Sequence, residues 1–382
     1  MRNHANKIGV KRDAILLVLL GLSILAAVTL FDRPTPEPTP IVGFKAPFVF
    51  GRFTIPQNNP LTEEAFELGR RLFYDTRLSG DNLMSCATCH RQELAFTDGL
   101  PRAIGKHGQE LDFSSMSLSN LLWGSRHFFW DGRERGLEKA VLQPIQDPGE
   151  MDQSLDALMD ELNEDPVYRE LYRTAYGEIT SESTASALAT FLRLLISNNS
   201  RYDQYLRGET TLTANEDFGR RLFMAHPDVK VSLRGGNCID CHSQFLTSGP
   251  ADAYDGFSNN GLDADSKLAA GLMDTTGEER HGGFFKVPTL RNIAVTAPYM
   301  HDGRLATLED VMNHYNHGIQ MSKTLSPLIL EADNLIADPT AAQGLNLTSE
   351  ETRAIIAFLH TLTDETFLTD ERFSNPFKRA DQ

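Results

Sequence analysis

The four cysteines of the chain all belong to two copies of one short pattern, C-x-x-C-H. The six residues, first in CATCH and then in CIDCH, are Cys86, Cys89, His90, Cys238, Cys241 and His242. In this pattern the two thiols form thioether bonds to the vinyl groups of a c-type haem, and the histidine supplies the proximal nitrogen to iron. Redox-active cysteine pairs would not need a histidine after both copies, and no cysteine is left for a disulfide. The sequence therefore predicts two covalently bound c-type haems.

The segments around the two motifs are also repeated. FELGRRLF (66–73) precedes the first motif and DFGRRLF (217–223) precedes the second, while ATFLRLLIS (189–197) resembles IAFLHTLTD (356–364) downstream. Each half therefore contains a helix, a haem motif, a long loop region and a closing helix. Such internal similarity indicates duplication of one structural unit.

Local signals favour helices in both units. Two capping boxes of the S/T-x-x-E type predict helix starts, at Thr213 with Glu216 and at Thr348 with Glu351. No strand-like alternation of any length is present. We therefore expect an all-α protein with two cytochrome c-like domains, at 46–205 and 206–382, each carrying one haem. The boundary falls near residues 200–210, where the sequence turns polar.

The N-terminus contains basic residues followed by an uncharged apolar run, AILLVLLGLSILAAVTLF (14–31). As a helix this run would reach about 27 Å, close to the roughly 30 Å of a bilayer's hydrocarbon core. It is longer than the ~7–15 apolar residues of a cleaved signal peptide, so we expect a single uncleaved membrane anchor rather than a cleaved signal. The proline-rich RPTPEPTP (33–40) predicts a stiff spacer, which makes residues 1–45 anchor and spacer. The body would then lie on the periplasmic side of the inner membrane.

The formal net charge of −16 argues against nucleic acid as a partner, because a phosphate backbone is bound by clustered Lys and Arg. An acidic surface suits a basic partner such as a small electron-carrier protein. It also serves simply to keep a protein soluble.

Several separate stretches resemble one known family. In chain order they are LGRRLFYDTRLSGDNLMSCATCH, FFWDGRERGLEKAV, PGEMD and FKVPTLRNIAVTAPYMHDGRLATLEDV. From about Pro60 to Asp364, they resemble the bacterial dihaem cytochrome c peroxidase and MauG superfamily. The resemblance implies that hydrogen peroxide reacts at the first haem, and that the second haem feeds or stores electrons.

The resemblance also implies roles for residues around the first haem. Glu150, which follows Pro144 in the same pocket-forming segment, matches the distal glutamate, and cleavage of the O–O bond needs a group that moves a proton between the two oxygens. Trp130 matches a tryptophan that lies between the haems and mediates electron transfer. Trp123 matches no motif and is expected in the core. His107 matches a distal histidine on a mobile loop, which caps the haem in the resting enzyme and swings away upon reduction.

The second haem has one expected distal ligand and several alternatives. His301 in PYMHDG matches a family histidine near this haem, and Tyr315 lies fourteen residues later. That position holds methionine in the family's peroxidases and tyrosine in MauG, so Tyr315 is the expected ligand. The alternatives are Met312, one of His314 and His317, and a site open to water.

The identity of this ligand has an electronic consequence. A neutral thioether stabilises ferrous iron, whereas an anionic phenolate stabilises ferric and higher iron. Axial ligands shift haem potentials over roughly 0.8 V. With tyrosine, the second haem would be harder to reduce and better able to share oxidising equivalents. A gate at His107 that opens upon reduction conflicts with this property, so the sequence combines peroxidase and MauG features.

Two positions depart from the family pattern. The family often has a glutamine where this chain has Ala140, and two nearby residues would be candidates to replace it, Gln143 and Gln146. A calcium ion often lies between the domains, with carbonyl ligands that match Thr296 and Pro298. The usual asparagine ligand falls at Ser115, whose hydroxyl is a poorer ligand for a hard cation.

Three functions are consistent with these features. The first is a peroxidase that reduces hydrogen peroxide to water, with electrons from a small cytochrome c or the quinol pool entering through the second haem. The second is a MauG-like enzyme that uses peroxide-derived high-valent iron to oxidise residues of a partner protein. The third is a membrane-anchored dihaem electron carrier, against which Glu150 and Trp130 argue. Family peroxidases are often dimers, so a homodimer is a further expectation.

Overall fold

The structure is a computed structural model of the chain. It describes residues 38–41, 47, 50–123, 127–243, 256–338 and 343–377. The predicted anchor and most of the spacer fall at 1–37 and lie outside the described residues. Within the described residues, no helix is both long and apolar enough to cross a membrane. The fold is that of one compact unit, Thr39–Gln382.

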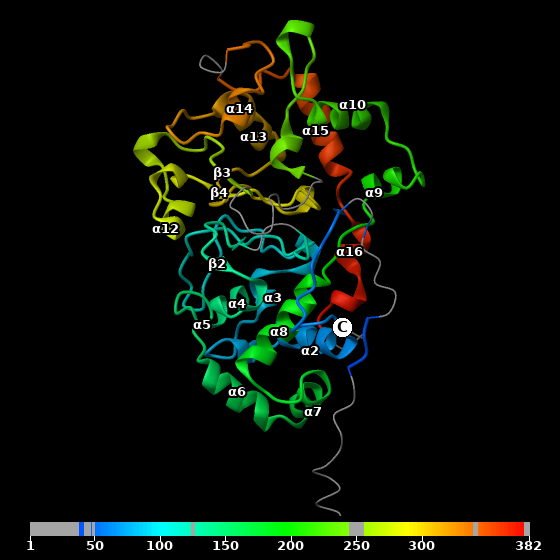
Figure 1. The fold of residues 1–382 in the computed structure, drawn as a ribbon, viewed down its shortest axis with the longest axis vertical. Helices are drawn as coiled ribbons and strands as arrows, with labels where there is room; N and C mark the ends of the chain where they lie inside the picture. The colour runs from blue at the N-terminus through cyan, green and yellow to red at the C-terminus, as the bar shows by residue number, and fades with distance from the viewer. Residues whose placement is uncertain are drawn as a thin grey trace, which may run out of the picture. The chain divides into compact units, whose positions relative to one another are not determined.

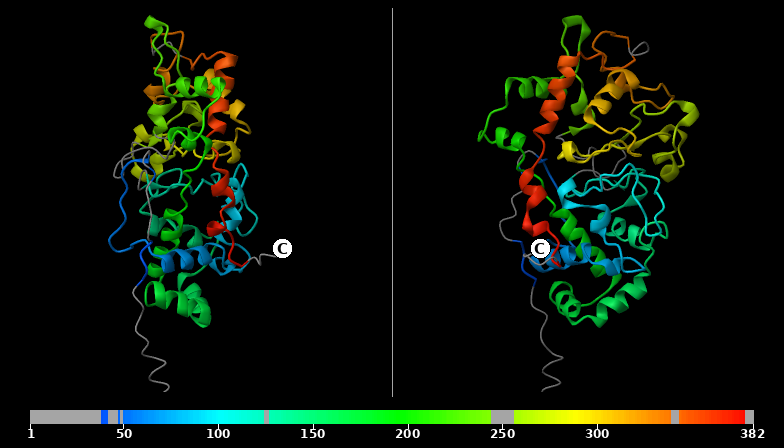
Figure 2. Two further views of the ribbon diagram at one scale, coloured as in Figure 1. Left: turned by 90° about the vertical axis from the view of Figure 1, so that its right-hand side faces the viewer. Right: turned by 180° about the vertical axis from the view of Figure 1, so that it is seen from behind.

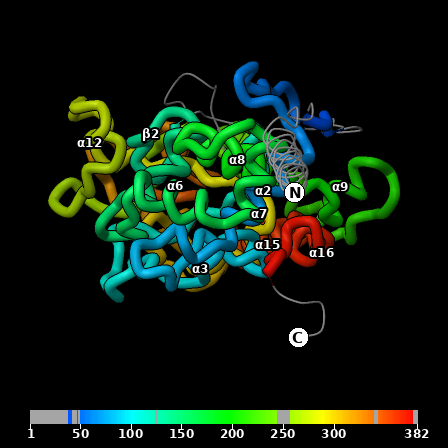
Figure 3. Tube along the Cα trace, turned by 90° about the horizontal axis from the view of Figure 1, so that it is seen from below, coloured from blue at the N-terminus to red at the C-terminus, as the bar shows by residue number. Residues whose placement is uncertain are grey.

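The N-terminal half, residues 50–200, is built mainly from helices around the first haem motif (Figure 1). Its helices are α2 (Glu63–Phe73), α3 (Cys86–Cys89), α4 (Leu137–Ala140), α5 (Gln143–Gln146), α6 (Leu155–Glu164), α7 (Pro166–Ala175) and α8 (Ser181–Arg193). Two short strands, β1 (His127–Phe128) and β2 (Glu134–Arg135), pair antiparallel. Figure 3 views the fold from the end that α6 and α7 occupy.

The C-terminal half, residues 201–364, surrounds the second motif. Its helices are α9 (Arg201–Leu206), α10 (Ala214–Met224), α11 (Cys238–Cys241), α12 (Leu272–Thr276), α13 (Leu308–Asn313), α14 (Pro327–Leu330) and α15 (Ser349–His360). A single π-helical turn, η9 (His314–Gly318), directly follows α13. Strands β3 (Phe257–Ser258) and β4 (Phe285–Lys286) form the second short antiparallel pair.

The same helix pair forms the centre of each half. In the first half α2 packs against α8, and in the second α10 packs against α15. A methyl group on Gly69 would lie 2.0 Å from the carbonyl oxygen of Ala187, and one on Gly219 would lie 1.8 Å from that of Ala354. Only glycine lets two backbones approach so closely. This contact explains why the glycine of GRRLF occurs in both sequence repeats.

The last helix, α16 (Glu365–Thr369), returns to the N-terminal half. It contacts the 3-10 turn η3 (Gln92–Leu94) of that half, and the ring of Phe367 lies 5.6 Å from that of Phe96 (Figures 1 and 2). Gln92 Nε2 donates hydrogen bonds to two carbonyl oxygens of this segment, those of Phe367 and Asp370. The sequence had assigned this segment to the second domain, but its apolar side chains belong to the first core.

Backbone and side-chain hydrogen bonds join the two halves near the centre of the molecule. The amide of Lys286 donates to the carbonyl of Trp130 at 2.8 Å, and the amide of Ser114 donates to the carbonyl of His301 at 2.9 Å. The Asn292 side chain donates to Ser197 Oγ at 3.0 Å. These contacts hold Trp130 at the junction between the two halves.

Candidate active site

The first haem motif lines a cavity of about 620 Å³. Cys86 and Cys89 lie on the single turn of α3, and His90 follows directly. His90 Nδ1 lies 2.8 Å from the carbonyl oxygen of Phe96, which fixes the ring when Nδ1 carries the proton. Burial lowers the pKa of His90, so the imidazole is neutral and its Nε2 lone pair is available to a metal.

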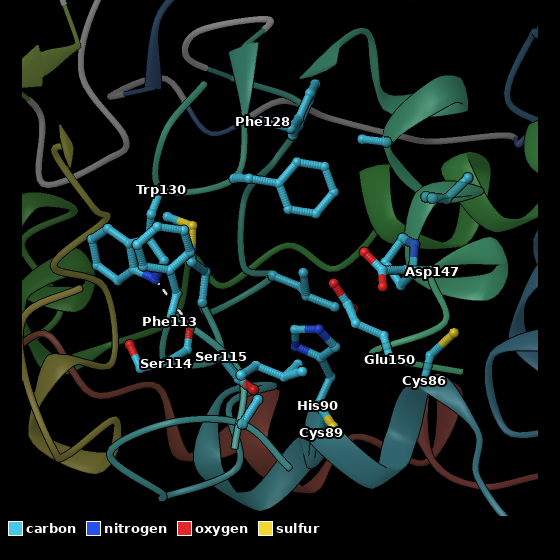
Figure 4. A pocket seen from close by; sticks show the side chains of 18 of the residues that line it. Cys86, Cys89, His90, Phe113, Ser114, Ser115, Phe128, Trp130, Asp147 and Glu150 are labelled. Atoms are coloured by element: carbon cyan, nitrogen blue, oxygen red, sulfur yellow. Dashed lines mark hydrogen bonds between the residues drawn. The ribbon is translucent and has the colours of Figure 1, made fainter. Parts of the chain in front are cut away.

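The residues of this cavity fit a covalently attached c-type haem. Both attachment thiols and the His90 imidazole line the cavity, and most of the other lining residues are aromatic or aliphatic. Figure 4 shows the His90 ring and the Glu150 carboxyl pointing into the same space, with Trp130 on the far side from Cys86. An apolar cavity with a few convergent polar groups is what a largely apolar macrocycle requires.

Glu150 is held at the cavity by its own backbone. Its amide donates to the carbonyl of Asp147 at 3.0 Å, and its carbonyl accepts from the amide of Lys106 at 2.9 Å. Burial raises the pKa of the Glu150 carboxyl; the Arg133 guanidinium, 3.8 Å from Oε1, opposes this rise and Asp147 adds to it. A carboxylate with a raised pKa is a stronger base, so it accepts a proton more readily than an ordinary glutamate does.

The two glutamines proposed to replace the family glutamine do not take that role in this structure. Pro144 and Ala140 line the cavity as expected. Gln143 instead donates to Glu134 Oε2 at 2.7 Å, and Gln146 donates to the carbonyl of Leu142 at 3.1 Å. Their side chains are hydrogen-bonded to nearby residues of the chain. The expectation that one of them replaces the family glutamine is therefore wrong.

A third glutamine, Gln109, lines the cavity instead, which the sequence did not indicate. Its Nε2 donates to the carbonyl of Gly149 at 2.6 Å, and its Oε1 is buried without a hydrogen-bond partner among the described residues. It also lines the cavity, next in space to Glu150. A buried acceptor without a donor is costly unless water or a ligand reaches it. No sequence motif marks Gln109; only the folding of its loop onto residue 149 reveals it.

The structure places His107 outside the cavity. Its side chain is 60% exposed, and Nε2 lies 3.7 Å from Asp152 Oδ2. The neighbouring Lys106 also pairs with Asp152, at 3.0 Å. Gly108 has a φ of +79°, which glycine adopts easily. In this arrangement the loop turns His107 towards Asp152, so His107 does not cap the first haem site.

Trp130 lies at the junction between the halves. Its indole Nε1 donates to the carbonyl of Ser114 at 2.9 Å, and the ring lines the cavity (Figure 4). Trp123, by contrast, packs against Phe50 and Phe53 in a separate small cluster. The prediction that Trp123 is a core residue is therefore confirmed.

The second motif repeats the proximal geometry of the first. Cys238 and Cys241 lie on the single turn of α11, and His242 Nδ1 lies 3.1 Å from the carbonyl oxygen of Pro288. Burial lowers the pKa of His242 to about 4, so this imidazole is also neutral. Pro288 lines the first cavity as well, so the hydrogen-bond partner of the second proximal histidine borders the first site. These residues likewise fit a c-type haem.

Tyr315 lies beside the second motif, within the π-helical turn η9. Burial raises the pKa of Tyr315 to about 12; a hydrogen bond from Asn260 opposes this, and the nearby Cys241 and Cys238 add to it. Asn260 Nδ2 lies 3.5 Å from the phenol oxygen. π-helical turns often occur at functional sites, because the extra residue redirects side chains.

The other candidate ligands in this stretch have other partners. Met312 is buried in the core of the C-terminal half. His314 Nε2 lies 3.1 Å from the carbonyl oxygen of Asn260, and His317 is exposed with Nε2 3.0 Å from Asn316 Nδ2. Among these candidates, the geometry favours Tyr315.

Met300 is a neighbour of Tyr315 that sequence reasoning did not include. The Asn260 amide that reaches the phenol also lies 3.2 Å from Met300 Sδ. Met300 has a φ of +75°, an uncommon conformation for a residue with a side chain. Its carbonyl accepts a hydrogen bond from Ser114 Oγ at 3.1 Å, which links it to the segment that holds Trp130.

His301 and the expected calcium ligands lie at the junction. The His301 ring stacks on Phe285 at 3.6 Å and lines a second cavity of about 580 Å³; burial lowers its pKa to about 4.

Ser115 Oγ donates to Asp98 Oδ2 at 2.8 Å, and Thr296 Oγ1 donates to the carbonyl of Ile293. No group of three or more His, Cys, Asp or Glu residues suited to a metal occurs in the described ranges. Calcium at Thr296 and Pro298 stays a prediction.

Comparisons with known proteins agree with this geometry. Residues 63–211 match the family described as di-haem cytochrome c peroxidase. The chain is 34% identical to the methylamine utilization protein MauG of Methylorubrum extorquens over 81% of each chain. It is 31% identical to the cytochrome c551 peroxidase of Nitrosomonas europaea, over 80% of this chain and 82% of that one. A crystal structure of a MauG-like protein associated with microbial copper homeostasis superposes with a TM-score of 0.74 at 34% identity, over 88% of this chain and 99% of that one.

The chain therefore belongs to the dihaem cytochrome c peroxidase and MauG family. The predicted helical, cytochrome c-like fold is confirmed, and the protein is a dihaem peroxidase-like oxidoreductase. Membership of this family implies two c-type haems, hydrogen peroxide as a substrate and an electron source.

Proposed function

We propose that this protein is a dihaem peroxidase that reduces hydrogen peroxide to water at the His90 site. Two electrons from an external donor would enter through the His242 site. One observation carries the proposal: the cavity that contains the haem motif also contains the Glu150 carboxyl, whose pKa burial raises. An electron carrier needs no acid–base group facing its metal.

The residues of the cavity provide the proton chemistry of this reaction. A haem held by Cys86, Cys89 and His90 would supply the redox-active iron for this reaction. Glu150 would accept one proton from the peroxide and return it to the departing oxygen, which would leave as water. Arg133, 3.8 Å from Glu150, would stabilise the carboxylate before the proton is accepted and after it is returned. Gln109 Oε1 is positioned to accept a hydrogen bond from the peroxide or a water.

The contacts at the junction support an electron route between the two sites. Trp130 lines the first cavity, and its carbonyl is bonded to the amide of Lys286. Two residues further, the carbonyl of Pro288 accepts from the second proximal histidine, His242. A packed and hydrogen-bonded connection of this kind keeps the indole close to both sites.

A second candidate function is MauG-like oxidation of residues in a partner protein, and Tyr315 favours it. A phenolate at the second haem would stabilise the ferric state and resist reduction by a donor. The position of His107 outside the first cavity also agrees with a site that reacts without prior reduction. The name of the Methylorubrum relative refers to methylamine utilization, and no partner follows from it for this chain.

The expected location and partners follow from the sequence. The apolar run at residues 14–31 supports a body held on the periplasmic side of the inner membrane by one anchor. A small cytochrome c or quinol is the donor we propose, and the net charge of −16 suits a basic carrier protein. A homodimer stays a prediction.

The test is a stopped-flow experiment on the holoenzyme with hydrogen peroxide and a reduced small c-type cytochrome. The proposal expects two donor molecules to be oxidised per peroxide, and donor oxidation to slow in Trp130→Phe. Rapid reaction with peroxide without donor oxidation would favour the MauG-like candidate. No reaction with peroxide, in either the ferric or the half-reduced protein, would leave only the electron carrier.

A further inference from the structure

A buried lysine borders the first cavity. Lys286, at the end of β4, is only 4% exposed. Its Nζ donates a hydrogen bond to the carbonyl of His127, and lies 5.1 Å and 5.9 Å from the ring centres of Phe257 and Phe128. Burial lowers the pKa of Lys286 to about 7, with no carboxylate in the described part of the chain contributing.

These partners do not compensate a buried ammonium. A charged group taken out of water needs an opposite charge, or it gives up its proton. One carbonyl and two aromatic faces offer only partial charges. An aliphatic side chain would fill this space at lower cost, so the lysine indicates an anion close to its amine.

The position of Lys286 suggests where that anion comes from. Lys286 belongs to the C-terminal half but lines the first cavity, and its amide is bonded to the carbonyl of Trp130. Trp130 and Cys86 lie on opposite sides of that cavity (Figure 4). In a haem, the two vinyl positions that bind the cysteines and the two propionates occupy opposite edges of the ring. A haem attached to Cys86 and Cys89 would therefore direct its propionates towards the end of the cavity with Trp130 and Lys286.

We propose that Lys286 binds a propionate carboxylate of the first haem. The haem attached to Cys86 and Cys89 would then be held by both halves of the protein. The proposal rests on the haem that family membership implies at this motif, and not on which of the two candidate functions is right.

The proposal has two physical consequences. A carboxylate close to the amine favours the ammonium form, so the lysine is charged once the haem is present. That positive charge stabilises the reduced form of the first haem over the oxidised form, which raises its reduction potential. Binding of the propionate by Lys286 also makes the interface between the halves part of the haem site. Movement of one half against the other would then change the reduction potential of the first haem.

The test compares three variants of the full holoenzyme. Lys286→Met removes both the charge and the hydrogen bond, Lys286→Gln keeps a donor for the His127 carbonyl without the charge, and Lys286→Arg keeps the charge. Lys323→Met is the matched control, because Lys323 is exposed and lies in the same half. The measurements are the propionate bending bands in resonance Raman spectra, and a redox titration in which EPR separates the two haems.

We expect Lys286→Met and Lys286→Gln to shift a propionate band and lower the potential of the His90 haem alone. Lys286→Arg and Lys323→Met should retain the wild-type values. Lys286→Gln keeps the test decisive if Lys286→Met does not fold. Wild-type Raman bands and potentials in Lys286→Gln would overturn the proposal, and so would equal shifts at both haems. Neither measurement requires turnover, so failure of the peroxidase proposal would be seen separately.

Discussion

The two haem regions of this protein share a proximal side and differ on the distal side. In both, a close-packed glycine joins two helices, Gly69 in the first and Gly219 in the second. Both proximal histidines direct Nδ1 to a backbone carbonyl. Near these histidine motifs, the first region presents the carboxyl of Glu150 and the second the phenol of Tyr315.

The difference shows which parts of the duplicated unit determine chemistry. The shared glycines and capped helices fix where each haem is attached. Glu150 lies in the turn after α5, and Tyr315 in a π-helical turn that has no counterpart among the described residues of the first half. A carboxyl provides proton transfer for O–O cleavage, whereas a phenol provides a ligand that favours oxidised iron. In the proposed function, segments outside the repeat would therefore make the first site reactive and let the second store charge.

The largest effect is expected from removing the acid–base group of the first site. Glu150→Gln keeps the shape of the side chain but cannot accept a proton. We expect the rate of the first reaction with peroxide to fall by about 10²- to 10⁴-fold, the usual contribution of a positioned acid–base group. Stopped-flow absorbance of the holoenzyme measures this rate. Glu164→Gln, on the exposed surface of α6, should react like wild type. An unchanged rate in Glu150→Gln would remove Glu150 from the mechanism.

The next prediction tests whether the two close-packed helix pairs, α2 with α8 and α10 with α15, contribute equally to stability. Gly69→Ala and Gly219→Ala should each lower the free energy of unfolding by about 1–3 kcal/mol, because each added methyl meets a backbone carbonyl that cannot move far. Gly282→Ala is the control, since its methyl would meet no atom closer than 3.4 Å. Thermal denaturation of the holoproteins measures the effect. A large loss of unfolding free energy in one glycine variant and none in the other would show that the two helix pairs are not equivalent.

The rate of reaction with peroxide at the first site should depend on pH through the ionisation of the Glu150 carboxyl. The carboxylate is the form that accepts a proton, and burial raises its pKa. As the pH falls through this raised pKa, the carboxylate is protonated, and the rate should fall by about tenfold per pH unit below it. The acid limb should therefore begin at a higher pH than for an ordinary glutamate. The measurement is the rate of peroxide reaction across pH 4 to 8. A similar limb in Glu150→Gln would assign it to another group.

A smaller effect is expected beside the second site. Asn260→Leu removes the amide that lies 3.5 Å from the phenol oxygen of Tyr315 and 3.2 Å from Met300 Sδ. At that length the bond is weak, worth about 1 kcal/mol or less. We expect the visible absorption bands of the second ferric haem to shift slightly while its ligand is retained. Loss of the ligand would show that Asn260 holds Tyr315 in place, and identical spectra would show no interaction.

The haem motifs, the repeat and the helix starts were readable from the sequence, because each depends on residues close together in the chain. The capping boxes at Thr213 and Thr348 are confirmed for this reason. The residue spacing from His301 led to Tyr315, which the structure places beside the second motif. These features need no knowledge of how distant segments pack.

The features that sequence did not provide depend on distant contacts. Gln109 reaches the first cavity only because its loop folds onto residue 149, and Lys286 reaches it from the other half. Asn260 and Tyr315 are 55 residues apart. Segment α16 packs on the first core although it follows the second repeat. The outward position of His107 depends on its pairing with Asp152, which motif matching does not show.

The most direct test of this comparison is the distal ligand of the second haem. EPR and optical spectra of the ferric holoenzyme should be compared for wild type, Tyr315→Phe and the control Met312→Leu. If Tyr315 is the ligand, we expect Tyr315→Phe alone to change the signals of the second haem and to leave those of the first intact. Unchanged signals in Tyr315→Phe, or a change in Met312→Leu instead, would contradict it.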